Sequence, residues 1–360
     1  MARPPLLDLV DAYRAGRTDY PADRLTPARL AWAIESGLAP VLARTSASFL
    51  RAGGPDADAV RGADLAARVV ADDQSDATVA LIDACRGRVG PLTLLKGIWL
   101  RHALHPEPHL RPMRDVDVLV EPAEVAEVED VLRGLGYLPA VEPDVDDYHG
   151  HHHAVPYRHP LTGVVFEVHR ALVPAAGPFG TDPMFDLGYV HSHLTDDTFR
   201  GRRVRRLADG LLLAHMAAHW SSSFKVVGGA GGLVVLLDLL ALAGRVDWPR
   251  AAADLRGSTA VRSLWLLLGY LEARGLRTLA PDVRALVRPP LGAADGVALA
   301  LLHAMMDVRV ADGRPYGRAV FTRRTFEIVW KTLLLPRPSA LNLASLPWRL
   351  LPSRWTGRSD

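Results

Sequence analysis

Two carboxylates lie two residues apart in the segment RPMRDVDVLV, residues 111–120. Side chains alternate along a β-strand, so Asp115 and Asp117 would share one face while the intervening valines share the other. Carboxylates this close repel each other unless a cation or a proton lies between them. A Mg²⁺ ion held by one or two carboxylates and by substrate phosphates meets that requirement. A solvated strand end is the alternative, because Asp-x-Asp is common by chance.

A second strand-like segment, VVFEVH at residues 164–169, carries Glu167 and His169 on one face and apolar residues on the other. If this strand pairs with the aspartate segment, Glu167 could join Asp115 and Asp117 around the same ions. Three carboxylates on neighbouring strands can form a two-metal site for phosphoryl transfer. Taken by itself, Glu167 also fits a solvent-facing acid on an edge strand.

The segment LLKGIWL, residues 94–100, predicts a strand, a turn and the start of a helix. Gly97 would let a phosphate approach the backbone, and the first N–H groups of the helix would bind it. Lys96 could add a direct charge contact. Arg111 and Arg114 flank the aspartates and could clamp phosphates, or they could be ordinary loop charges. An ordinary strand-to-helix turn with a solvated lysine is the alternative for the whole segment.

The elements that position these groups form a compact mixed segment between helical sequences. Strands are expected at residues 92–95, 115–120, 137–141, 153–158 and 164–170. Helices are expected at residues 26–52, 57–86, from Pro122, and at 207–220, 233–243, 249–256, 260–274 and 293–311. We therefore predict an α+β fold with three parts. A small mixed β-sheet core at residues 89–175 follows an N-terminal helical region, residues 1–88, and precedes a C-terminal helical domain, residues 176–360.

Composition narrows the class of protein. The 360 residues are 49% hydrophobic and 23% charged, as in ordinary globular proteins, and the net charge of +2 gives no strong nucleic-acid signal. Cys85 is the only cysteine, which excludes an intramolecular disulfide and a cysteine-based zinc site and indicates a reducing compartment. We find no signal-peptide pattern and no apolar run suited to a membrane span, so we expect a cytoplasmic protein.

The three motifs LLKGIWL, RPMRDVDVLV and VFEVHRAL, in this order and spacing, resemble the uncharacterised bacterial nucleotidyltransferase family of the DNA polymerase β superfold. Later helical segments also match in style, with Asp238 and Trp248 at the expected places, and the resemblance covers residues 90–250. The wider superfold has a Gly-Ser turn where this chain has Lys96-Gly97, so the mode of triphosphate binding differs in detail.

The resemblance implies that Asp115, Asp117 and Glu167 are the catalytic carboxylates and the ligands of two Mg²⁺ ions. It also implies that Lys96 and Gly97 face the phosphates of a nucleoside triphosphate (NTP). Arg111, Arg114 and His169 are further candidates for nucleotide binding.

Two groups of histidines could indicate other kinds of metal site. The run HGHHH at residues 149–153 could suggest zinc, but consecutive side chains on a strand diverge, so a solvated loop or a place at the mouth of the site is favoured. His215 and His219 are four residues apart on a predicted helix, without the glutamate of a zincin motif. We expect them to pack against the β/α segment.

The sequence thus predicts a metal-dependent nucleotidyltransferase that moves a nucleoside monophosphate from an NTP to an acceptor hydroxyl and releases pyrophosphate. The acceptor is unidentified, with a small molecule or peptide favoured over RNA because the net charge is low. A catalytically inactive nucleotide-binding adaptor with the same fold is the alternative. A histidine-based metallohydrolase is a third hypothesis.

Overall fold

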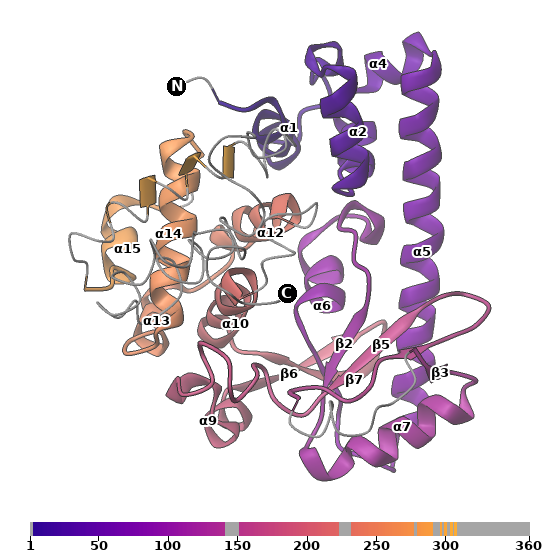
Figure 1. Ribbon diagram of the computed structural model, residues 1–360, viewed down its shortest axis with the longest axis vertical. Helices are drawn as coiled ribbons and strands as arrows, with labels where there is room; N and C mark the ends of the chain where they lie inside the picture. Colours follow the sequence, from indigo (N-terminus) through magenta and orange to yellow (C-terminus); the bar gives the residue numbers. More distant parts are fainter. Residues whose placement is uncertain are drawn as a thin grey trace, which may run out of the picture.

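The structure is a computed structural model that describes residues 3–140, 151–222, 232–276 and 279–290, and single positions between 296 and 307. In these residues helices flank a mixed seven-stranded sheet, which confirms the predicted α+β class (Figure 1). His149, most of the helix predicted at 293–311, and the chain after 307 lie outside the described residues. No described helix has both the length and the apolar character that a membrane span requires.

The seven strands are short and lie in the order β3-β4-β5-β2-β1-β7-β6. Their bounds are β1 (Thr93–Leu94), β2 (Val116–Leu119), β3 (Leu138–Pro139), β4 (Tyr157–Arg158), β5 (Val165–His169), β6 (Leu194–Phe199) and β7 (Arg202–Leu207). Central β2 pairs parallel with β5 and antiparallel with β1, and β1 runs parallel to β7. The remaining pairs are antiparallel.

The β6–β7 hairpin extends the sheet beyond residue 175, where the sequence had placed the end of the sheet core. Its turn contains Arg200 and Gly201, both with positive φ (46° and 78°), which is the backbone that a tight hairpin with right-handed twist requires. Charged residues fill both strands, so the hairpin lacks the apolar alternation by which strands are recognised in a sequence.

Five helices precede the sheet: α1 (Pro5–Arg14), α2 (Pro27–Glu35), α3 (Ala39–Thr45), α4 (Ala47–Ala52) and α5 (Pro55–Cys85). The single helix predicted over 26–52 is therefore three helices. Gly37, at φ 74°, ends α2, and Ser46, with non-helical backbone, separates α3 from α4. Thr26 caps α2, accepting a hydrogen bond from the Arg29 backbone N–H at 3.4 Å.

Among the described residues, eight α-helices lie between the strands or follow the sheet: α6 (Lys96–Leu104), α7 (Val125–Gly134), α9 (Leu187–Ser192), α10 (Asp209–Ser222), α12 (Gly232–Ala243), α13 (Trp248–Asp254), α14 (Ala260–Ala273) and α15 (Pro281–Leu286). In Figure 1 the long helix α5 runs along one side of the molecule, and α13, α14 and α15 gather on the opposite side. The sheet and α6 lie between them.

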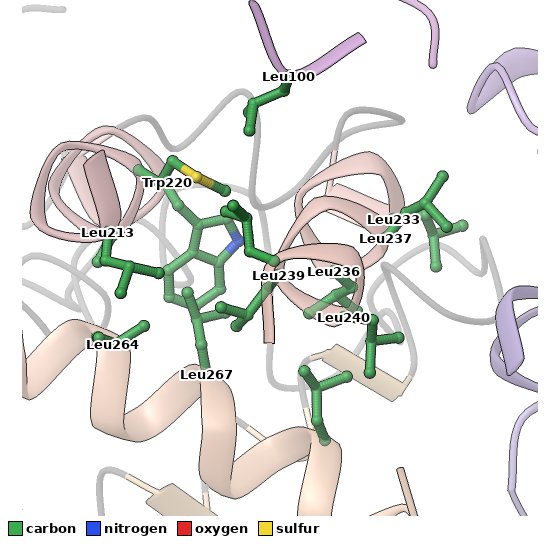
Figure 2. Close-up of a cluster of buried hydrophobic side chains, with 14 of the residues drawn as sticks. Leu100, Leu213, Trp220, Leu233, Leu236, Leu237, Leu239, Leu240, Leu264 and Leu267 are labelled. Atoms are coloured by element: carbon green, nitrogen blue, oxygen red, sulfur yellow. The ribbon is translucent and has the colours of Figure 1, made fainter. Parts of the chain in front are cut away.

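Two apolar cores hold these layers together. One joins the apolar face of β2 and β5, with Val116, Val118, Phe166 and Val168, to α7 and the C-terminal part of α5. The other joins α6, α10, α12 and α14 around buried leucines and Trp220 (Figure 2). Since neighbouring residues on a strand point to opposite faces, the face of β2 and β5 that carries the polar side chains points away from α5 and α7.

Candidate active site

Asp117 and Glu167 lie side by side on the polar face of the sheet. Asp117 is in β2, and its partner in the parallel pairing with β5 is Glu167. This confirms the predicted pairing of the two strands. Asp117, Glu167 and His169 each offer a ligand atom within 4.8 Å of the other two. Asp117 is only 2% exposed, whereas the Glu167 side chain is 24% exposed. The two carboxylates therefore lie at different depths in one cluster.

His169 fixes the Asp117 carboxylate. Its Nε2 lies 2.9 Å from Asp117 Oδ1 and 3.7 Å from Glu167 Oε2, so Nε2 carries the proton that it donates to Asp117. Burial alone would lower the pKa of His169, but the hydrogen bonds to Asp117 and Glu167 outweigh burial and raise it. His169 therefore holds the buried Asp117 carboxylate in place. Its role in nucleotide binding stays a prediction.

Lys96 stands at the first position of α6, and its Nζ lies 3.5 Å from Asp117 Oδ2. No side chain caps this helix end, so its first N–H groups have no side-chain acceptor. Burial opposes ionisation of Asp117, but Lys96 and His169 outweigh it and lower the Asp117 pKa well below its ordinary value. Lys96 and Gly97 thus begin a helix beside the acids, where the sequence predicted a turn.

Asp115 precedes β2 and stands outside the group of converging ligand atoms. Burial, followed by the charges of Asp117 and Glu167, raises the pKa of Asp115 to about 6. Asp115 is thus hard to ionise first because it is buried, and also because two other carboxylates lie near it. Of the three predicted ligands, the structure thus brings two into direct proximity and the third into the same electrostatic field.

The two predicted arginines lie apart from this cluster. Arg111 is buried and donates to Asp238 of α12 from Nε (2.9 and 3.1 Å) and from Nη2 (2.7 Å). Its Nη1 donates to the Pro112 carbonyl at 3.3 Å. This pairing occupies the guanidinium, so we do not propose a phosphate contact for Arg111. Arg114 is exposed and next to Asp115 in the chain, and its role in nucleotide binding stays a prediction.

Two histidines of α10 complete the surroundings. The pKa of His219 falls to about 3, first because of Lys96 and then because of burial. The pKa of His215 falls well below its ordinary value because of burial and Lys96. Both rings are therefore neutral near Lys96 and Asp117. The sequence indicated contact with the β/α segment, but nothing in their i, i+4 spacing indicated that they approach the acids.

A run of three histidines lies next to the acids as well. His151, His152 and His153 each offer a ring nitrogen within 4.8 Å of the other two. The expectation that consecutive side chains diverge does not hold, because His151 and His152 lie in a bend and only His153 forms a bridge, to His169. The favoured expectation was a solvated loop, with a place at the mouth of the site as the next alternative. The run lies beside Glu167 and His169, which is closer to the second expectation.

The donor set suits a hard divalent cation. Carboxylate oxygens are the ligands that Mg²⁺ prefers in proteins. Three acids, Asp115, Asp117 and Glu167, stand against two nearby cationic groups, Lys96 and His169, which leaves an excess of negative charge. An ion at Asp117 and Glu167 would relieve this excess, so the residues present fit such a group.

Three comparisons relate this chain to known proteins. The family described as "Uncharacterised nucleotidyltransferase" matches residues 26–274. The solved structure of the antibiotic-resistance factor ANT(2'')-Ia is similar over 52% of this chain and 94% of that chain, with 18% identity and a TM-score of 0.34. A search of curated proteins gives no match.

Proposed function

Because this chain belongs to the family described as uncharacterised nucleotidyltransferase, we propose that it moves a nucleoside monophosphate from an NTP to an acceptor hydroxyl. The family match also confirms the resemblance carried by the three sequence motifs. The single observation that supports the reaction best is the register of β2 and β5, which sets Asp117 directly beside Glu167.

The proposed reaction forms one bond and breaks one bond. The acceptor oxygen attacks the α-phosphorus, the bond to the β-phosphate oxygen breaks, and pyrophosphate leaves. Asp115, Asp117 and Glu167 would hold Mg²⁺, which when bound neutralises the triphosphate and lowers the pKa of the acceptor hydroxyl. Lys96 lies beside Asp117, which supports the polar face of the sheet as the place where the phosphates would bind.

The chain's own cations and helix end would orient the triphosphate. Lys96 is close enough to Asp117 to share a ligand with it, and the side chain is 16% exposed. The uncapped start of α6 offers N–H groups to phosphate oxygens. A Cβ added at Gly97 would meet Arg111 and Met113 at 3.5 to 3.7 Å, which is ordinary contact distance. Packing therefore does not demand glycine here, and we assign Gly97 to close approach of a phosphate.

Glu167 would serve the acceptor side of the site. It is the more exposed of the two converging carboxylates, so an acceptor hydroxyl can reach it more easily than it can reach Asp117. A carboxylate in this place can also take up the proton that the hydroxyl loses. We propose a small molecule or a peptide as the acceptor class.

The test is transfer of label from NTPs to candidate acceptors. The full chain, Mg²⁺ and each of the four α-labelled NTPs would be incubated with pools of small hydroxylated molecules and with peptides. We expect label transfer and pyrophosphate release in the wild-type protein and neither in an Asp115→Ala, Asp117→Ala variant. Transfer that survives both substitutions would refute the site. NTP binding without turnover for every acceptor would favour the inactive adaptor.

A further inference from the structure

The histidine run beside the acids forms a compact cluster. The ring centroids of His151, His152 and His153 are 4.1 to 4.8 Å apart. The bend at residues 151 and 152 turns side chains that would alternate on a strand toward a common point. His169 adjoins the cluster, with its ring centroid 5.3 Å from those of His152 and His153.

A hydrogen bond fixes which ring nitrogen of His153 carries the proton. The Nδ1 of His153 lies 2.7 Å from the Ala154 carbonyl oxygen. Since a carbonyl only accepts, Nδ1 must carry the proton, which leaves Nε2 of His153 with its lone pair. A backbone carbonyl that holds the second ring nitrogen in this way is a usual support for a metal-binding histidine. The Nδ1 of His152 is buried without a hydrogen-bond partner.

The cluster borders the carboxylates but differs from them in chemistry. His153 Nε2 lies 3.9 Å from Glu167 Oε2. The cluster of Asp115, Asp117 and Glu167 offers oxygen ligands, which suit Mg²⁺. Three imidazoles offer nitrogen ligands, which suit a borderline transition metal ion. In a tetrahedral zinc site, nitrogens at 2.0–2.1 Å from the ion lie about 3.3 Å from one another. Small rotations of the rings would bring nitrogens now within 4.8 Å to that spacing.

We propose that His151, His152 and His153 bind one divalent transition metal ion, with Zn²⁺ as the reference ion, at the edge of the carboxylate site. Three imidazoles leave one position of a tetrahedral ion open. Because His153 lies next to Glu167, the bound ion would add positive charge beside Glu167, on the proposed acceptor side of the carboxylate site. Binding at the histidines does not depend on the proposed transferase reaction.

The experiment uses the full chain without an affinity tag of histidines, treated with a chelator and then titrated. Zn²⁺ would be followed by calorimetry, and Co²⁺ by its visible d–d absorption, which reports nitrogen ligands. Both titrations are done in excess Mg²⁺, which occupies oxygen-rich sites. We expect one equivalent of Zn²⁺ or Co²⁺ and an absorption spectrum of a four-coordinate ion.

Three variants assign the binding. The His151→Ala, His152→Ala variant removes two ligands from a bend and should weaken Zn²⁺ by at least about 100-fold. The matched control, His191→Ala, His193→Ala, removes two histidines of the α9 region and should bind as wild type. An Asp117→Asn variant should also keep Zn²⁺, which separates this site from the proposed transferase site.

Three results would overturn the proposal. One is the absence of stoichiometric Zn²⁺ binding in wild type. Another is equal affinity in the His151→Ala, His152→Ala variant and the control. The last is loss of Zn²⁺ in Asp117→Asn with retention in the double histidine variant, which would place the ion on the carboxylates. Circular dichroism of each variant confirms that the comparison is between folded proteins.

Discussion

Asp117 and Asp238 are both almost completely buried, and they have opposite surroundings. Asp117 is 2% exposed on the polar face of the sheet, and Asp238 is 1% exposed on α12. The pKa of each is lowered, because in each case nearby cationic groups outweigh the burial that disfavours a buried anion. The two sites differ in what else lies close to the carboxylate.

Asp238 has a matched partner. Arg111 binds both carboxylate oxygens through two nitrogens, and His105 Nε2 lies 3.7 Å away. A bidentate guanidinium satisfies the charge and the lone pairs together. This pair joins α12 to the loop before β2, so it holds the helical layer against the strand that carries Asp117. Its surroundings leave no need for a further cation.

Asp117 shares its surroundings with two other acids. Lys96 and His169 contact it, but Asp115 and Glu167 add negative charge to the same region. The difference teaches that burial and a lowered pKa do not by themselves mark a functional acid. What separates the proposed site from the structural pair is a surplus of carboxylates that the protein's own cations leave uncompensated.

The largest expected difference between Asp117 and Asp238 is in the rate of nucleotidyl transfer. We expect Asp117→Asn to reduce nucleotidyl transfer on the order of 1,000-fold or more, because a metal ligand supports several kcal/mol of transition-state charge stabilisation. Pyrophosphate release in the presence of Mg²⁺ measures it. The control is Asp196→Asn on exposed strand β6, which should leave the rate unchanged. Equal loss in both variants would mean that the assay reports something other than the proposed site.

The ion pair between Arg111 and Asp238 should show its effect in the free energy of unfolding. Asp238→Ala leaves Arg111 buried without its partner, so we expect a loss of about 3–5 kcal/mol in the free energy of unfolding. Urea denaturation measures this loss. Replacing both partners, with Arg111→Met and Asp238→Leu, should restore part of it, since a buried ion pair gives little net stability over apolar packing. If the double variant is less stable than Asp238→Ala, the pair does more than balance charge.

Gly97→Ala separates ligand approach from packing. An added methyl group has ordinary contacts in the structure and favours helix, so stability should be unchanged or higher by up to about 1 kcal/mol. If a phosphate approaches this backbone, the KM for NTP should rise about tenfold, the scale of one lost hydrogen bond. Steady-state kinetics and thermal unfolding of the same preparation test both parts. An unchanged KM would remove Gly97 from the proposed site.

The smallest effect is a difference in pH dependence. Because the pKa of Asp238 is lower in the folded protein than its ordinary value of 3.8, its ion pair stabilises the fold above that value. This contribution is lost as the pH falls from that value through the folded pKa. Asp238→Asn lacks it, so its stability should fall less steeply in acid than that of wild type. Parallel slopes in urea denaturation from pH 4 to pH 2 would contradict this explanation.

The sequence predicted the local parts of this site well. The alternation in β5 placed Glu167 and His169 on one face, and the valines of β2 indicated a strand buried on the other. The aspartate pair and the Lys96-Gly97 step lie next to each other in space as the motifs suggested. These features depend on side-chain periodicity within a few residues, which a sequence displays directly.

Long-range features were not predictable in the same way. The partner of Arg111 is 127 residues away in the chain, and only the docking of α12 reveals it. The β6–β7 hairpin is charged on both strands, so its one available signal was the glycine at 201. The convergence of His151 to His153 depends on a bend that no residue type in the run requires. In each case tertiary contacts, and not local pattern, determine the structure.

The most direct test of the central claim compares the two buried aspartates in one binding experiment. Each of the four NTPs, with Mg²⁺, would be titrated calorimetrically into wild type, Asp117→Asn and Asp238→Asn, all verified as folded. We expect wild type and Asp238→Asn to bind the same NTP with similar affinity. We expect Asp117→Asn to bind it at least about tenfold more weakly. Equal binding by wild type and Asp117→Asn would contradict the central claim.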